Sequence, residues 1–219
     1  LHRRRHSFPT RRSSDLTQLS GLSATQVAGL TTTQVTALTT TQVAGLTSTA
    51  LGGLTTTQAT ALTSTDLAVL TTTQVKGLTT SQLNVLDTTQ LGSLTSTLVG
   101  ALSTTQVSGL STTQVTALTS TQVGGLTTTQ LASLSTTSLN ALDTTDIAAL
   151  TATQVGGLSS TQLAGLTATS LGALESTDIA ALTVTQAKGF TSTQLGLLDT
   201  TQFAALTGTQ LSGLSATQV

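Results

Sequence analysis

The chain contains no cysteine, methionine, tryptophan or tyrosine, and it has only one proline and three phenylalanines among 219 residues. Without cysteine there is no disulfide framework, no thiolate nucleophile and no thiolate metal site. Apolar runs are short as well, because the longest ones, such as Leu98–Leu102, stop at five residues. A membrane span needs about 20 mostly apolar residues. The sequence therefore predicts neither a disulfide-stapled domain nor a membrane-spanning segment.

The few charges are segregated along the chain. All five arginines and both histidines lie within residues 1–12. From residue 17 onward there are two cations and seven acids, a net charge of −5: Lys76 and Lys188 against Asp66, Asp87, Asp143, Asp146, Glu175, Asp178 and Asp199. Nucleic-acid binding needs a basic stripe, which this part of the chain lacks. We therefore expect no nucleic-acid partner.

Residues 1–16 share no pattern with the rest of the chain, and residues 6–16 resemble a translated sequencing adapter. The repeat described below begins in mid-unit at Thr17 and stops in mid-unit at Val219. We therefore expect residues 1–16 to be a non-native, disordered artefact. Residues 17–219 are expected to form a single repeat domain, a fragment of a longer array.

What the chain does contain is an eight-residue unit that repeats 24 times without a gap from Leu22 to Gly213. Position one is Leu in 23 copies, position two is mostly Thr, position four is Thr in 23, and position five is Gln in 17. Position six is apolar, and position eight is Gly or Ala in 19 copies. Such a strict repeat predicts one small unit stacked many times.

Local signals in the octad favour a very short capped helix. Position two holds residues that cap helix N-termini, and the Gln three residues later can complete a capping box. The apolar residues at positions one and six have the spacing of a hydrophobic staple. Gly or Ala at position eight permits a tight exit and close approach of a neighbouring backbone. We therefore predict an all-α solenoid of very short capped helices, one per eight-residue repeat.

A β-solenoid is the alternative fold. Thr and Val favour strands, and Thr41-Gln42-Val43-Ala44-Gly45 alternates as a strand would. A single long helix is disfavoured, because an eight-residue period would spread the leucines around its surface.

Three positions carry more specific expectations. The near-invariant Thr at position four is predicted to be packed, with its hydroxyl bonded to the backbone of an adjacent unit. Positions three and seven drift in sequence and are predicted to face solvent. Asp87, Asp143 and Asp199 are spaced 56 residues apart, which indicates a higher-order period of seven octads.

Residues that could carry chemistry are sparse, and we predict no enzyme, no catalytic residue, no cofactor and no metal site. No histidine follows residue 6 to act as a base for a nucleophile. Asp143 with Asp146, and Glu175 with Asp178, pair acids at positions two and five. A Ca²⁺ site needs six to eight oxygens, so we interpret each pair as a cap with its capping-box partner.

The remaining unusual side chains are interpreted as structural. Lys76 and Lys188 occupy the variable position seven and are expected to be solvated. Phe190 and Phe203 replace Leu and Val at positions one and six, so both are expected to be packing variants in the core.

The octads resemble those of long bacterial repeat proteins with the pattern Leu-Thr-x-Thr-Gln-Val-x-Ala/Gly, as in Leu38–Gly45 and Leu150–Gly157. Those proteins are labelled adhesin-like or haem-utilisation proteins. The resemblance covers Thr17–Val219 and implies no functional residue. Haem binding is not supported, because this region has none of the His, Met, Cys or Tyr side chains that ligate haem iron.

Together these observations predict a non-enzymatic stalk, spacer or fibre segment of a large bacterial surface or secreted protein. Its expected partners are neighbouring repeats or like chains stacked end to end, and a surface ligand is a further candidate. The alternative function is a binding module that uses the Thr-x-Thr of positions two and four. Paired threonines of this kind resemble the ladders of ice-binding β-solenoid proteins, and a glycan is the other candidate ligand.

Overall fold

The computed structural model describes residues 21–218, so the expectation for residues 1–16 lies outside the described part of the chain. Within that part every element is a helix of four to six residues, and each octad forms one. The helices are α2 (Ala24–Ala28), α3 (Thr32–Thr36), α4 (Thr40–Ala44), α5 (Ser48–Gly52), α6 (Thr56–Ala59), α7 (Ser64–Ala68), α8 (Thr72–Gly77), α9 (Thr80–Asn84), α10 (Thr88–Gly92), α11 (Ser96–Ala101), α12 (Thr104–Ser108), α13 (Thr112–Thr116), α14 (Ser120–Gly124), α15 (Thr128–Ser133), α16 (Thr136–Leu139), α17 (Thr144–Ala148), α18 (Ala152–Val155), α19 (Ser160–Ala164), α20 (Ala168–Gly172), α21 (Ser176–Ala181), α22 (Val184–Ala187), α23 (Ser192–Leu197), α24 (Thr200–Ala204) and α25 (Gly208–Gly213). The all-α solenoid is confirmed, and the β-solenoid alternative is wrong for this region.

Most helices begin at a capping box, as predicted. In α3 the cap Thr31 has extended backbone angles, and its hydroxyl accepts a hydrogen bond from the Gln34 N–H at 3.2 Å. Gln34 Oε1 in turn accepts from the Thr31 N–H at 2.8 Å. Among the described helices, the box is missing only in α5, α11, α16 and α20, where position five is Ala, Leu or Ser. This pairing satisfies two N–H groups that a helix start would otherwise leave open.

Each helix ends after little more than one turn, without a left-handed glycine. The position-eight residue keeps right-handed angles, as in Gly45 with φ −82°. The next position-one N–H then donates to the position-six carbonyl, as Leu46 does to Val43 O at 3.1 Å. The leucine itself turns extended and leads into the next cap. The predicted close approach at position eight is confirmed, whereas a glycine-specific exit conformation is not used.

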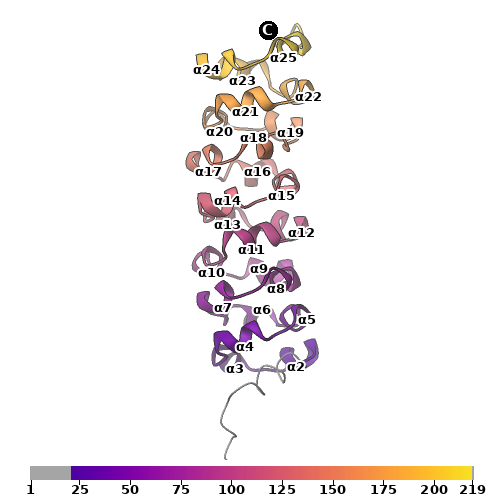
Figure 1. Cartoon of the computed structure of the whole chain (residues 1–219), viewed down its shortest axis with the longest axis vertical. Coiled ribbons are helices and arrows are strands. Elements are labelled where there is room, and N and C mark those ends of the chain that lie inside the picture. The colour runs from indigo at the N-terminus through magenta and orange to yellow at the C-terminus, as the bar shows by residue number, and fades with distance from the viewer. Residues whose placement is uncertain (1–20, 219) are drawn as a thin grey trace, which may run out of the picture.

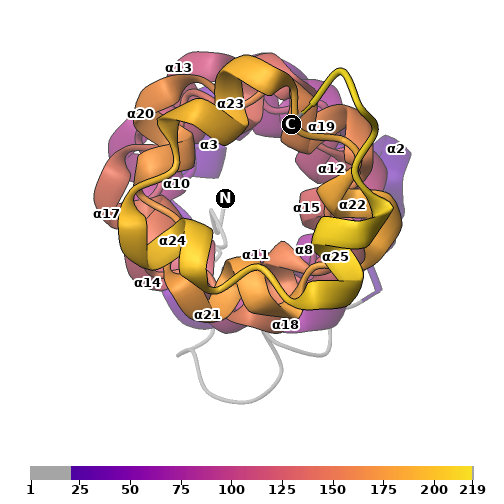
Figure 2. The ribbon, with the colours of Figure 1, turned by 90° about the horizontal axis from the view of Figure 1, so that it is seen from above.

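The octads wind into a column whose successive turns stack along one axis (Figure 1). Seen along that axis, the helices form a ring (Figure 2). Each helix packs against the helix three octads further along, as α5 does on α8 and α18 on α21. Side-chain hydrogen bonds between turns join residues 28 to 31 positions apart, for example Gln122 to Leu94. One turn therefore holds about three and a half octads, and seven octads complete two turns.

The apolar side chains of positions one and six form the core between turns. Val115, Leu118 and Val123 are 0–6% exposed, and Phe190 at 2% is a packing variant as predicted. The prediction for Phe203 is wrong, because this side chain is 45% exposed. It belongs to α24 in the last described turn, and no described turn stacks above it. The core is thus one continuous apolar seam along the column, in which each turn covers apolar side chains of the turn before it.

Position eight lies where one turn crosses over the next. A Cβ added to Gly125 would come within 2.6 Å of Ser96 O, a position-three carbonyl one turn earlier. Gly77 and Gly189 meet Ser48 and Ser160 in the same way. At these crossings a small residue is needed because backbones of neighbouring turns touch, and not because of an unusual φ.

Candidate functional site: the glutamine ladder and the outer surface

The position-five glutamines tie consecutive turns together. Gln122 Oε1 accepts from the Thr119 N–H at 2.9 Å, which completes its own capping box. Its Nε2 donates to Leu94 O at 2.7 Å and to Leu91 O at 3.0 Å, both in the preceding turn. One amide therefore satisfies the cap N–H at the start of its own helix and two carbonyls at the end of a helix one turn away.

This arrangement, which we call the glutamine ladder, repeats along the column. Its members each donate to the position-one carbonyl 28 residues earlier, and those within complete octads are only 2–7% exposed. They are Gln58, Gln74, Gln82, Gln90, Gln106, Gln114, Gln122, Gln130, Gln154, Gln162, Gln186, Gln194, Gln202, Gln210 and Gln218. Buried amides that satisfy all their partners both stabilise and fix the register of packed elements.

Sequence reasoning assigned these glutamines only to their capping boxes and missed the contact between turns. A signal was present, because a capping box accepts Glu as well as Gln, yet Glu never occurs at position five in 24 octads. Gln, which is both a hydrogen-bond donor and an acceptor, holds this position in 17 of the 24 octads, whereas acidic residues hold it in three. The donor serves the carbonyls of the preceding turn.

Acidic side chains replace the ladder amide at three places. Asp143 caps α17 and Asp146 completes its box. In α21 the Asp178 carboxylate accepts from the N–H of Glu175, whereas the Glu175 side chain makes no cap hydrogen bond. The interpretation as a cap with its box partner is therefore confirmed for Asp143 with Asp146. Asp66 does the same in α7, where the hydroxyl of Thr63 donates to its carboxylate at 2.7 Å.

The two acidic boxes alter proton affinity. Burial raises the pKa of the Asp146 carboxyl, and the nearby Asp143 carboxylate adds to the rise, while a hydrogen bond from the Asp143 N–H opposes it. Burial likewise raises the pKa of Asp178, with Glu175 in the corresponding role. Desolvation penalises the charged form of a carboxyl group, which explains the direction.

A surface groove of about 450 Å³ lies where Ser170 replaces the ladder glutamine. Ser170 is too short to reach Leu142 O, and Asn140 from the preceding turn substitutes for part of the lost amide. Asn140 Oδ1 accepts from the Thr167 N–H and from Ser170 Oγ, both at 3.0 Å. Its Nδ2 donates to Gly165 O at 2.8 Å. The groove is therefore the space left by a shortened side chain whose capping role has passed to another turn.

The near-invariant threonine of position four faces outward, so the prediction that it is packed is wrong. It is exposed in all 24 octads, from Thr25 to Thr209, and no hydrogen bond is recorded from its hydroxyl to another turn. It is the second residue of each helix. Position seven is mostly exposed as predicted. Position three is often half-buried, because position eight of the next turn lies over it.

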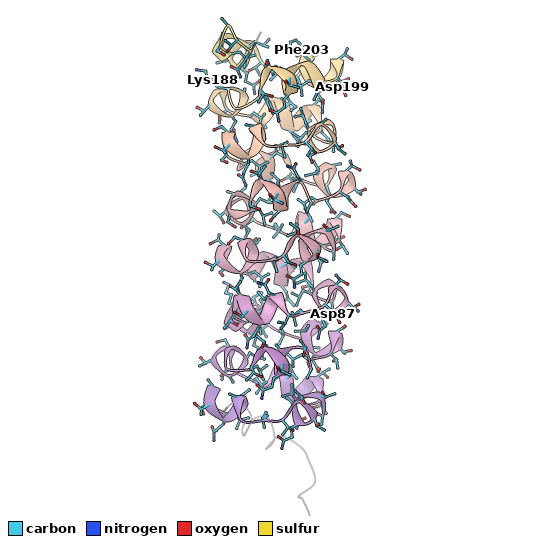
Figure 3. All side chains as sticks on the ribbon, turned by 180° about the vertical axis from the view of Figure 1, so that it is seen from behind. Asp87, Lys188, Asp199 and Phe203 are labelled. Carbon is cyan, nitrogen blue, oxygen red and sulfur yellow. The ribbon has the colours of Figure 1, made fainter. Side chains whose placement is uncertain are left out.

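Acidic side chains gather on one side of the column. Helices seven apart share the same place around the ring in Figure 2, so α10, α17 and α24 form one line. Their caps are Asp87, Asp143 and Asp199, which explains the 56-residue spacing as two full turns. Asp66 and the α21 pair lie on the adjacent line of α7, α14 and α21, which packs against the first. Lys188 lies on the opposite side from Asp87 and Asp199 (Figure 3).

The described residues 21–218 hold no group of three His, Cys, Asp or Glu side chains placed to bind a metal ion. None of their helices has the length and apolarity to cross a membrane. Lys76 and Lys188 are exposed, as expected for position seven.

Three segments of the chain match the ALTTAQ repeat: residues 61–96, 99–128 and 171–208. Together they cover a little under half of the sequence, and each lies within the octad array. A search of the curated proteins found no match. The ALTTAQ-like segments and the uniform geometry between them show a tandem repeat array, folded as a helical solenoid.

Proposed function

We propose that this array is a non-enzymatic stalk, spacer or fibre segment of a large bacterial surface or secreted protein. The observation that carries the proposal is the one-dimensional pattern of contacts, in which each helix packs on the helix three octads away. Such a structure grows in length without changing its cross-section. The outer surface is rich in hydroxyl groups and sparse in charge, which fits an extracellular setting.

The natural partner of an end turn is another turn of like octads. Phe203 and Leu211 are 45% and 37% exposed in the last described turn, whereas position six is at most 6% exposed in the earlier octads. A further turn, later in the same chain or from a like chain, would cover them as every inner turn is covered. The proposal therefore includes end-to-end stacking of like repeats.

The spacer function is tested by duplicating residues 86–141, seven octads, and measuring small-angle X-ray scattering of both proteins. We expect the maximum dimension to grow by the height of two turns, with an unchanged radius of gyration of the cross-section. A duplicated protein that becomes thicker without becoming longer would contradict the spacer. A dilution series of the original chain measures end-to-end stacking, which should increase the apparent length at high concentration.

The outward threonine of position four favours a second candidate, the binding module. Positions one, two, five, six and eight are explained by core, cap or ladder contacts, whereas nothing in the fold requires Thr at position four. The helices that carry the threonines are distributed all around the ring, however, and do not lie on one flat face (Figure 2). This distribution favours the stalk over ice binding, which needs a regular plane. Thermal hysteresis measured with the purified array would favour ice binding over the stalk.

A further inference from the structure

The glutamine ladder is not uniform along the column. Eight of the ten octads within residues 54–133 carry a position-five Gln, and so do all four within residues 182–213. Only two of the six octads within residues 134–181 do, Gln154 and Gln162. The other four carry Ser or Asp at this position: Ser138, Asp146, Ser170 and Asp178. We call residues 134–181 the joint.

Each replacement in the joint leaves a carbonyl without its usual donor. The position-one carbonyls 28 residues before the four substituted positions are those of Leu110, Leu118, Leu142 and Leu150, and none accepts a side-chain hydrogen bond from the described residues. The groove beside Ser170 lies in this same segment. Fewer ladder bonds therefore join the turns of the joint, where Gln154, Gln162 and Asn140 supply the side-chain bonds that remain.

Two of the four replacements are buried acids. Asp146 and Asp178 are 3% and 1% exposed, and each accepts the N–H of its own cap through Oδ2. A carboxylate has no hydrogen to offer, so in its charged form it cannot donate to a carbonyl oxygen of the preceding turn. Protonation turns the carboxyl into a donor, as the amide of Gln is.

The charged groups around the two acids all have the same sign. Asp146 lies in α17, which packs on α14 and α20, and those helices and their caps carry no charge. The charged group that acts on it is its own cap, Asp143, and Asp178 stands at the ladder position that faces the neighbouring residue Ile147. Asp178 lies in α21, which packs on the uncharged α18 and on α24. The charged group that acts on it is its cap Glu175. The other acids on the elements around it are Asp199, the cap of α24, and Asp146, beside the Ile147 that the ladder position of α21 faces.

We propose that the joint is an acid-strengthened connection in the column, in which protonation of Asp146 and Asp178 tightens the contact between successive turns. The sign follows from linkage. A carboxyl whose pKa is raised by folding binds its proton more tightly in the folded state, so acidification stabilises the fold. This contribution is complete below the pKa of the unfolded aspartate, near 4, and is lost as the pH rises through the raised folded value. The joint is the loosest part of the column at neutral pH.

Hydrogen–deuterium exchange of the full chain, followed by mass spectrometry of peptides, tests this proposal. At pH 7 we expect amides within the joint to exchange several-fold faster than those of residues 54–133, after correction for intrinsic rates. At pH 4.5 that difference should shrink. The double variant Asp146→Asn/Asp178→Asn keeps the shape of both side chains and supplies N–H donors, so its joint should be protected at both pH values.

A matched control is Asp66→Asn, at the same position of an octad whose cap is the uncharged Thr63. We expect this variant to keep the pH response of the joint. Equal exchange in the joint and in residues 54–133 at both pH values would overturn the proposal. So would a double variant with the pH response of the original chain. If the double variant is not helical by circular dichroism, Asp178→Asn alone should show a reduced response, and an unchanged response would likewise overturn the proposal.

Discussion

Removing one rung of the glutamine ladder should destabilise the column more than removing a capping box alone. In Gln122→Ala the N–H of Thr119 loses its acceptor, and two carbonyls of the preceding turn lose their donor. Leu91 O still accepts from the Leu94 N–H, whereas Leu94 O keeps no recorded partner. An orphaned buried polar group costs about 1–3 kcal/mol, and a lost hydrogen bond about 0.5–1.5 kcal/mol. We therefore expect a loss of about 2–4 kcal/mol in the free energy of unfolding.

The measurement is urea unfolding followed by far-UV circular dichroism, with the slope of the transition compared between variants. Gln34→Ala is the matched control, because Gln34 makes the same capping box but is exposed and has no recorded contact with another turn. It should cost about 0.5–1 kcal/mol. Equal losses in the two variants would refute the argument that the amide holds turns together.

Three further predictions concern other positions of the octad. Gly125→Val should lower Tm by several degrees or prevent folding, because its Cβ would meet a carbonyl of the preceding turn. Gly124→Ala enters open space and should stabilise the column by about 0.5–1 kcal/mol. Equal effects of the two variants would contradict the crossing of turns. Ser170→Gln should raise Tm by restoring a rung, and an unchanged or lower Tm would show that the groove cannot accept the amide. Thr119→Ala should lower the free energy of unfolding by about 0.5–2 kcal/mol through the lost cap. Thr121→Ala, at the exposed position four, should lower it by less than about 0.5 kcal/mol, both measured by urea unfolding. The reverse order would mean that position four makes a structural contact.

The helices themselves follow from local rules that the sequence displays openly. A cap at position two, a box partner at position five and a staple at positions one and six act within eight residues. Thr31 and Gln34 therefore behave as the pattern predicts, and so does the acidic pair Asp143 and Asp146. The sparse charge and the lack of an aromatic or histidine cluster in the octad array also follow directly from the sequence. These features need no knowledge of how octads are arranged relative to one another.

The contacts between turns could not be predicted in the same way. They depend on how many octads complete a turn, and that number results from small backbone angles added over 28 residues. Without it, Thr121 appeared packed because it is nearly invariant, and Phe203 appeared buried because it stands at a core position. Both predictions failed at the step from octad to column. Gln122 likewise showed its local role and concealed its contact with Leu94.

The seven-octad period connects the sequence to the outer surface of the column. Since one turn holds three and a half octads, an insertion of one octad rotates everything beyond it by two sevenths of a turn. An insertion of seven octads restores the original orientation after two turns. Asp87, Asp143 and Asp199 follow this longer period, and the acids at other octads lie on the adjacent line of helices. Lys76 and Lys188 are separated by twice that period, and Lys188 lies on the opposite side from Asp87 and Asp199. A column lengthened in units of 56 residues thus keeps each face aligned, which a spacer that must present its ends in a fixed orientation requires.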